Sequence, residues 1–197
     1  VIADDGEILI RGPGVMKGYH NLEKDTKEAI DEAGWLHTGD IGEIDSDGFL
    51  KITDRKKDLI VTSGGKNIAP APIEAALCRM KLVSQAVVFG NNRKYLSALI
   101  TLDPAAAQRW AAEKEIVAPQ SSLPQNARLQ AAIEAELATL NESLERFETI
   151  KKFAIVPREF SIDKGEVTPS LKIRKKVIER NFTDLINSLY PDVPRNN

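Results

Sequence analysis

The hydrophobic pattern changes character near residue 54, and this change limits the folds open to the chain. Before that point apolar residues lie in short runs bounded by glycine, proline and aspartate, which is typical of β-strands joined by turns. After it, strand-like runs alternate with longer stretches of helical periodicity. We therefore predict an α+β fold in which a β-rich segment, residues 1–54, precedes a mixed segment. The junction is "TDRKKD", residues 53–58.

The first segment carries the local signals of strands, turns and one helix. A run from Glu7 to Arg11 has strand-like composition and stops at Gly12-Pro13-Gly14, which breaks regular structure. Polar helix formers over residues 21–32 indicate a short helix that ends before a glycine. Apolar residues on either side of "DSDG", residues 45–48, predict a β-hairpin, because aspartate and glycine are favoured in tight turns.

The second segment is expected to alternate between strands and helices. The run over residues 58–65 predicts a strand that leads into a pair of glycines. Alternation at Tyr95, Ser97, Leu99 and Thr101 favours an amphipathic strand over residues 95–103. Further strands are expected at 83–90 and 153–160, and helices at 72–80, 104–115, 126–147 and 170–189.

Composition excludes several classes of protein. The net charge of −2 over 197 residues argues against a general nucleic-acid binder. One cysteine cannot form an internal disulfide, which fits a reducing, cytoplasmic setting. No apolar run reaches about 18 residues, so no transmembrane segment is predicted. The chain opens on Val1 and enters a strand almost at once, and we interpret it as a piece of a longer protein.

Asp40 and Arg55 are the first candidates for binding chemistry. Asp40 follows Thr38-Gly39, where the absence of a side chain lets a ligand approach the backbone closely. A carboxylate there can accept hydrogen bonds from the two hydroxyls of a ribose, and the guanidinium of Arg55 can bind a ribose or phosphate oxygen. Each residue also fits a structural role, in a turn and in a solvated charged loop respectively.

Two basic or glycine-rich stretches complete the set of candidates. "TSGGKN", which contains Gly64, Gly65 and Lys66, lacks the spacing of a phosphate loop, so it is either a hairpin turn or a thin surface that a ligand can pass. The basic run over residues 168–180 includes Lys172. It has no interleaved aromatic residues and forms no single stripe, so nucleic-acid binding is not expected.

The remaining reactive side chains give weaker signals. His20 and His37 have no neighbours with metal-ligand spacing, so no zinc site is predicted. Cys78 lies in an apolar helical pattern and is predicted to be a buried packing residue. No set of serine, histidine and aspartate can be argued from the sequence.

In order along the chain, "GEILIRGPGVMKGYHN", "GWLHTGD", "GFLKITDRKKDLIVTSGGKNIAPAPIE" and "TPSLKIRKK" resemble the closing third of an AMP-forming acyl-CoA synthetase. This is the adenylate-forming superfamily, which also contains luciferase and the adenylation domains of peptide synthetases. The forms "DRKKDLI", "SGGKNIAP" and "TPSLKIRKK" are most similar to the long-chain fatty acid branch. The resemblance covers essentially the whole chain, and the motifs occur in the family's order.

The resemblance implies a role for residues of the first segment and the junction. Asp40 matches the aspartate of the family's "TGD" motif, which binds the ribose hydroxyls of ATP and acyl-AMP. Arg55 matches an arginine that also contacts the ribose. Lys57 matches the hinge about which the small C-terminal domain rotates. Residues 1–54 are then the β-rich end of the large domain, 55–58 the hinge, and 59–197 a mobile C-terminal domain with a small sheet flanked by helices.

The resemblance also implies roles in the second segment. Gly64 and Gly65 match a hairpin that lines the pantetheine tunnel of CoA, with Lys66 beside it. Lys172 matches the lysine required for adenylation. Many members carry Gly-Lys at this motif, whereas Leu171 precedes Lys172 here, so the match depends on the "KIRKK" that begins at Lys172. Lys164, in "DKGE", is the rival lysine.

The implied activity is a two-step ligase reaction that uses ATP, CoA and Mg²⁺. A fatty acid is converted to acyl-AMP with release of pyrophosphate, and the acyl group then passes to CoA. The phosphate loop, acyl tunnel and magnesium-binding glutamate are expected upstream, so the 197 residues alone are predicted to be inactive.

Three alternatives stay open: a ligase for another carboxylic acid, transfer to a carrier protein, and a non-catalytic binding module. The full-length protein is expected in the cytoplasm, and its peripheral association with a membrane is left open.

Overall fold

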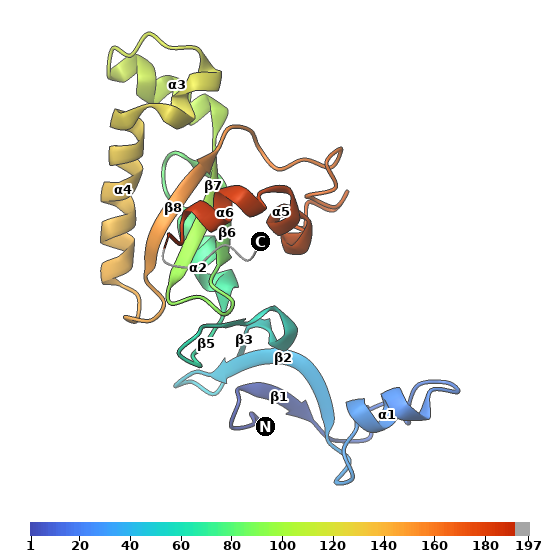
Figure 1. Ribbon diagram of the computed structural model, residues 1–197. Helices are drawn as coiled ribbons and strands as arrows, with labels where there is room; N and C mark the ends of the chain where they lie inside the picture. Colours follow the sequence, from blue (N-terminus) through green and yellow to red (C-terminus); the bar gives the residue numbers. More distant parts are fainter. Residues whose placement is uncertain (192–197) are drawn as a thin grey trace. The chain divides into compact units, whose positions relative to one another are not determined.

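The computed structural model describes residues 1–191, which form two compact units. The first unit is Val1–Leu59, and the second begins at Ile60. Figure 1 shows the first unit in blue and the second from teal to red. The α+β fold class predicted from the sequence is confirmed by this mixture of small sheets and helices.

The first unit is built on an antiparallel sheet of strands β1 (Glu7–Ile10), β2 (Leu36–Ile44) and β3 (Leu50–Arg55), in that order. Helix α1 (Glu23–Ala29) lies in the connection between β1 and β2. The predicted hairpin is confirmed, because β2 and β3 pair from Ile44↔Leu50 toward Asp40↔Arg55.

The side chain of Asp45 explains the tight turn between β2 and β3. Its Oδ1 accepts hydrogen bonds from the backbone N–H groups of Asp47, at 3.0 Å, and Phe49, at 2.8 Å. Gly48 has a φ of 86°, a left-handed conformation in which glycine is favoured. A short 3₁₀ turn, η1 (Lys56–Asp58), follows β3.

The second unit is built on a sheet with the order β6 (Val83–Phe89), β7 (Leu96–Leu102) and β8 (Ile150–Val156). Strands β6 and β7 are antiparallel, and β7 and β8 are parallel. A parallel pair requires a long crossover connection, which here contains α3, η2 and α4. These elements are α3 (Pro104–Glu113), η2 (Gln120–Gln125) and α4 (Ala127–Glu142).

Helices cover both faces of this sheet (Figure 1). One hydrophobic cluster joins the sheet to α2 (Pro70–Leu77), α3 and α4. A second cluster joins the opposite face to α5 (Lys175–Asn181) and α6 (Thr183–Ser188). Successive residues of β6 point to opposite faces of the sheet: Val87 lies in the second cluster and Val88 in the first.

The prediction that β7 is amphipathic was wrong, because all seven of its residues are buried. Its two hydroxyl residues are buried with hydrogen-bond partners. The Oγ of Ser97 donates to the Oη of Tyr190 at 2.7 Å, and the Oγ1 of Thr101 accepts from the N–H of Gln85 at 3.1 Å. The alternation of polar and apolar residues therefore marks two buried faces of different chemistry.

Other predictions also needed correction. The helix expected over residues 170–189 is replaced by a hairpin followed by the two short helices α5 and α6. The helix expected to reach residue 147 ends at Glu142. Cys78 is exposed, because α2 ends at Leu77 and the cysteine follows on the solvent side.

A small hairpin opens the second unit. Strands β4 (Ile60–Val61) and β5 (Asn67–Ile68) form a two-stranded antiparallel pair. Ile60 and Ile68 are buried in the first hydrophobic cluster, so the base of the hairpin is part of the core. The long strand expected over residues 58–65 is thus shortened to two residues, and the remainder forms the turn.

Candidate functional site

Asp40 and Arg55 lie opposite each other on β2 and β3. The Nε of Arg55 is 2.7 Å from the Oδ1 of Asp40, which makes a close ion pair across the two strands. The Asp40 side chain is 26% exposed and that of Arg55 is 55% exposed, so both are accessible to a ligand. The structure therefore joins two candidates that lie 15 positions apart in the sequence, as a carboxylate acceptor beside a forked donor.

The turn that presents Asp40 is fixed to the neighbouring strand. Thr38 donates from Oγ1 to the carbonyl oxygen of Ile8 at 2.7 Å and accepts from the N–H of Asp40 at 3.1 Å. Gly39 has a φ of 70°, and a Cβ placed there would meet no atom within 4 Å. Its conformation, rather than crowding, therefore favours glycine at this position.

Glu7 is a site residue that the sequence reasoning missed. Its side chain is only 4% exposed, yet its carboxylate has three partners. Oε1 accepts from the N–H of Gly39 at 2.9 Å. Oε2 lies 2.9 Å from Nδ1 of His37 and 2.9 Å from Nζ of Lys56. The available signal was a charged residue at the start of an otherwise apolar strand, "EILI".

The charges around Glu7 stabilise one another. Burial raises the pKa of Glu7, but hydrogen bonds from Lys56, His37 and the Gly39 N–H outweigh it and leave the pKa below its ordinary value. Hydrogen bonds to Asp5 and then Glu7 raise the pKa of Lys56. Lys56 Nζ lies 2.6 Å from Oδ2 of Asp5, so Lys56 fastens the end of β3 to the start of β1.

Lys57 follows this anchored lysine and is exposed within η1. Over residues 1–191 its side chain has no ion pair or hydrogen-bond partner. Adjacent lysines therefore differ in environment: Lys56 is held by two carboxylates, and Lys57 is free to solvent.

The glycine pair forms the tip of the β4–β5 hairpin. Thr62 donates from N–H to the carbonyl oxygen of Lys66 at 3.0 Å, and Gly65 donates to the carbonyl oxygen of Thr62 at 2.9 Å. Gly65 has a φ of 73°, with no atom within 4 Å of a hypothetical Cβ, and Gly64 is also exposed. The Nζ of Lys66 lies 5.4 Å from the centre of the Phe147 ring. The tip is thus a thin, open backbone surface.

Lys172 lies on a hairpin that precedes α5, outside any helix. Leu171 donates to the carbonyl oxygen of Thr168 at 2.8 Å, and Thr168 donates to that of Lys172 at 2.9 Å. Leu171 has a φ of 60°, which is uncommon for a residue with a branched side chain. A three-residue hairpin loop of this kind usually ends in a left-handed residue, here Leu171. Glycine adopts that conformation without strain, so the geometry favours glycine at the position before the lysine. Lys172 itself is exposed.

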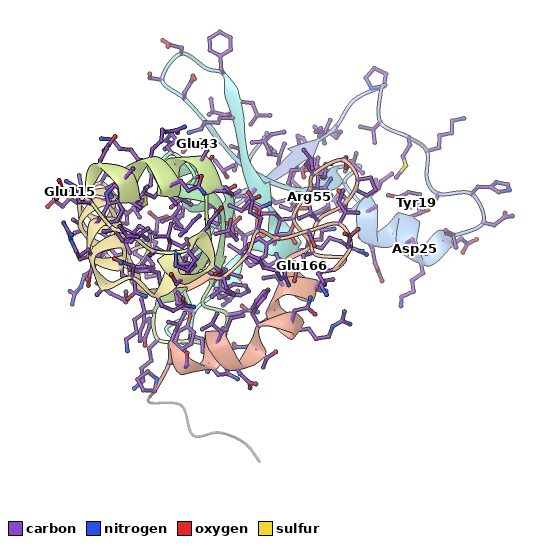
Figure 2. The ribbon with its side chains drawn as sticks, turned by 90° about the horizontal axis from the view of Figure 1, so that it is seen from above. Tyr19, Asp25, Glu43, Arg55, Glu115 and Glu166 are labelled. Atoms are coloured by element: carbon purple, nitrogen blue, oxygen red, sulfur yellow. The ribbon has the colours of Figure 1, made fainter. Side chains whose placement is uncertain are left out.

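An ion pair between the buried Glu166 and the partly exposed Arg158 holds the base of the Lys172 loop. Arg158 donates from Nη1 and Nη2 to the two carboxylate oxygens of Glu166, at 2.6 and 2.8 Å, and Asn181 donates to Oε1 at 3.0 Å. Glu166 has a fully buried side chain and its pKa is lowered to about 2, chiefly by the hydrogen bonds from Arg158. Figure 2 labels Glu166 on this loop. Its backbone oxygen accepts from Arg174, so the loop is anchored on both sides.

The other candidates occupy simpler surroundings. Lys164 is exposed on the same loop as Lys172, before Gly165. Among the residues that the structure describes, His20 has a side-chain hydrogen bond only with its neighbour Asn21, at 3.2 Å. Residues 1–191 contain no group of three or more histidine, cysteine, aspartate or glutamate side chains placed to hold a metal ion.

The candidates therefore fall into two sets. Asp40, Arg55 and Lys57 belong to the first unit, where the first two are in contact. Residues 64–66 and Lys172 belong to the second unit, on separate loops.

None of the helices over residues 1–191 is both long and apolar enough to cross a bilayer.

Comparison with curated proteins finds relatives along nearly the whole chain. A long-chain-fatty-acid–CoA ligase of Mycobacterium tuberculosis, FadD15, is 44% identical over 96% of this chain and 32% of its own length. The mouse long-chain-fatty-acid–CoA ligase ACSBG1 is 35% identical over 95% of this chain and 29% of its own length. The chain thus spans about a third of the length of the curated relatives it matches.

Solved structures share the fold. The adenylation domain of a carboxylate reductase from Mycobacterium chelonae has a TM-score of 0.71 and 25% identity, over 95% of this chain and 28% of its own. ATP-bound MatB from Rhodopseudomonas palustris has a TM-score of 0.60 and 26% identity, over 91% of this chain and 31% of its own. The model of the AMP-binding enzyme C-terminal domain matches residues 57–194, and the chain belongs to this family of adenylate-forming enzymes.

Proposed function

We propose that this chain is the C-terminal part of an AMP-forming long-chain fatty acid–CoA ligase. The observation that carries the proposal is 44% identity, over 96% of the chain, to a relative named as such a ligase. In the first step a carboxylate oxygen of the fatty acid attacks the α-phosphorus of ATP, and the bond to pyrophosphate breaks. In the second step the CoA sulfur attacks the acyl carbon, the bond to AMP breaks, and the thiol proton is lost.

The Asp40–Arg55 pair is proposed to bind the ribose of ATP and acyl-AMP. The Asp40 carboxylate accepts hydrogen bonds from the ribose hydroxyls, while Arg55 both orients it from 2.7 Å and contacts the ribose. The turn from Thr38 to Asp40 is hydrogen-bonded to Ile8 and Glu7, which supports a fixed position for this carboxylate. A site on paired strands holds a ligand with less motion than a free loop.

Lys172 is proposed to act in adenylation. Its ammonium group bridges the fatty acid carboxylate and the α-phosphate, where negative charge builds in the transition state. A compact cation on a long stem suits delivery from a moving unit. The exposed position of Lys172 on an anchored hairpin supports this role, since the backbone is fixed and the side chain is free to reach a substrate.

Rotation at Lys57 is proposed to exchange the two steps. We assign residues 1–54 to the large domain, 55–58 to the hinge, and 59–197 to the mobile domain. This rotation withdraws Lys172 from the adenylation site and brings Gly64 and Gly65, with Lys66 beside them, to the pantetheine arm of CoA. The open backbone at Gly65 supports this role, because no side chain blocks a thin ligand.

The substrates of the complete protein are then a fatty acid, ATP and CoA. The ATP bound to MatB, a relative in fold, fits this proposal. Mg²⁺ is proposed to be held by upstream residues, where it would neutralise the phosphates of ATP. We propose a cytoplasmic location for the complete protein, with peripheral association with a membrane.

The test is an ATP-dependent thioester assay of the complete protein with acids of graded chain length. Preference for the longer acids is expected, because each CH₂ buried in an acyl tunnel contributes about 0.8 kcal/mol. Preference for short or aromatic acids would redirect the proposal to another ligase. Transfer to a phosphopantetheine carrier protein in place of CoA would change the acceptor, and absence of any adenylation would favour a binding module. The 197 residues alone are expected to show no adenylation.

A further inference from the structure

The β6–β7 loop supports the base of the glycine hairpin. Ser63 donates from N–H to the carbonyl oxygen of Arg93 at 2.9 Å, and Asn92 donates to that of Val61 at 2.8 Å. The N–H of Val61 donates to Oδ1 of Asn91 at 3.1 Å. Because β4 and β5 have only two residues each, the hairpin depends on these contacts for its position.

The β6–β7 loop and the base of the glycine hairpin also pack closely, and this close packing requires glycine at position 90. A Cβ at Gly90 would lie 2.4 Å from Cδ2 of Leu96 and 3.2 Å from Cγ2 of Ile60, which begins β4. The β6–β7 loop then turns back on itself, with Arg93 donating to the carbonyl oxygen of Gly90 at 2.9 Å. The hairpin base and the loop thus form one packed piece, with Arg93 at its edge.

The side chain of Arg93 connects this piece to the end of α6. Its Nη2 donates to Oδ1 of Asn187 at 2.6 Å, and its guanidinium carbon lies 4.7 Å from the centre of the Tyr190 ring. The first contact is a charge-assisted hydrogen bond, and the second is a cation–π contact. Arg93 is therefore fixed by two side chains that lie 94 and 97 positions away.

Tyr190 gives this connection a rigid end. The ring is buried and stacks on Tyr95 with 5.0 Å between centres. Its hydroxyl accepts from Oγ of Ser97 at 2.7 Å and donates to the carbonyl oxygen of Phe89 at 3.1 Å, so it is fastened to both β6 and β7. Movement of the Arg93 side chain is thus resisted by the sheet itself.

We propose that Arg93 is a positioning residue for the CoA step, which fixes the glycine hairpin to the sheet and to α6 so that they turn as one body. The inference rests on the proposed function of Gly64 and Gly65. The Lys172 loop has a separate support in the Glu166–Arg158 pair, so loss of Arg93 leaves that support in place. The effect of Arg93 is therefore confined to one of the two half-reactions.

The test measures the two half-reactions of the complete ligase with Arg93→Ala. Formation of acyl-AMP from fatty acid and ATP is expected to stay within about twofold of the parent protein. Thioester formation from supplied acyl-AMP and CoA is expected to fall on the order of tenfold, with a raised KM for CoA, because a charged hydrogen bond is lost. Arg93→Lys keeps a cation and a donor and should restore part of the loss.

Two further variants sharpen the comparison. Lys94→Ala removes an adjacent exposed cation and should leave both steps unchanged. Asn187→Ala removes the acceptor of the Arg93 hydrogen bond and should reproduce the selective loss, even if Arg93→Ala does not fold. Equal loss in both half-reactions, or none in either, would overturn the inference.

Gly65→Val separates failure of the inference from failure of the proposed function. If Gly65→Val spares the CoA step, the hairpin is not at the CoA site, and the function proposed for it is wrong. If Gly65→Val impairs that step and Arg93→Ala and Asn187→Ala do not, only the positioning role of Arg93 is wrong.

Discussion

Leu171→Gly should stabilise the second unit, although it removes a large apolar side chain. Leu171 has a φ of 60° and is 77% exposed, so its side chain contributes little to the core. A non-glycine residue in the left-handed region costs roughly 1–2 kcal/mol, and glycine relieves this cost. Glycine also gains about 0.5–1 kcal/mol of conformational freedom in the unfolded chain, which opposes the gain. The net stabilisation is about 0.5–1 kcal/mol.

The measurement is urea unfolding of the 197-residue chain, followed by circular dichroism and checked by a thermal scan. A change of 1 kcal/mol corresponds to about 2–4 °C in the melting temperature of a protein of this size. Leu171→Ala is the control, because it shortens the side chain and keeps the unfavourable φ. The alanine variant should differ little from the parent protein.

The comparison between the two variants decides the argument. If alanine stabilises as much as glycine, the gain comes from removing an exposed apolar group, and strain at Leu171 is not the cause. If glycine destabilises, relief of the left-handed conformation is smaller than the added freedom of the unfolded chain. Either result would refute the reasoning from φ.

Three other substitutions test particular contacts. Glu166→Gln should lower the free energy of unfolding near pH 7 and make that free energy less sensitive to acid. The folded pKa of about 2 lies below the ordinary 4.5, so the carboxylate contributes on the order of 3 kcal/mol of stability above pH 4.5. This contribution is lost as the pH falls toward 2. Acid titration of unfolding measures this, and an unchanged acid limb would contradict it. Lys172→Ala in the complete ligase should reduce acyl-AMP formation by about 100-fold or more and leave CoA transfer from supplied acyl-AMP nearly intact; equal losses would remove its assigned role. Lys57→Pro should leave acyl-AMP formation nearly intact and impair transfer to CoA, because proline fixes φ at the hinge. Normal CoA-dependent turnover in this variant would exclude Lys57 as the hinge residue.

Local patterns in the sequence were sufficient for most of the strands and helices. The β2–β3 hairpin follows from "DSDG", since the turn is held by the side chain of Asp45 within its own segment. Asp103 before α3 and Pro104 as its first residue likewise mark its start, where Asp103 accepts from the N–H of Ala106 at 2.7 Å. These features depend on residues fewer than five positions apart.

The errors have two causes: distant parts of the chain decide one outcome, and a local hairpin or helix end overrides the apolar or basic pattern in the others. The polar residues of β7 are buried because helices cover both faces of the sheet, which alternation alone does not reveal. The basic run before α5 reads as helical, but Thr168 pairs with Lys172 and the local hairpin replaces the first turn. Cys78 was assigned to the core because it continues an apolar pattern past the end of α2.

The candidate site shows the same division between local and distant information. The identities of Asp40, Arg55 and Lys172 came from motifs, and their roles remain proposals. Glu7 carried no motif-level signal of its importance, since its partners His37 and Lys56 lie 30 and 49 positions away. Only the paired strands show that one buried carboxylate supports both the Gly39 turn and the end of β3.

The anchoring of Lys56 narrows where the proposed rotation can take place. Lys56 is tied to Asp5 and Glu7 within the first unit, at 2.6 and 2.9 Å. Ile60 is buried in the hydrophobic cluster of the second unit. Between these fixed points lie only Lys57 and the two residues that follow it, and a rotation about so short a segment must be absorbed by a few backbone dihedral angles. A single proline at Lys57 therefore removes much of the available freedom, whereas the same substitution in a long linker would not.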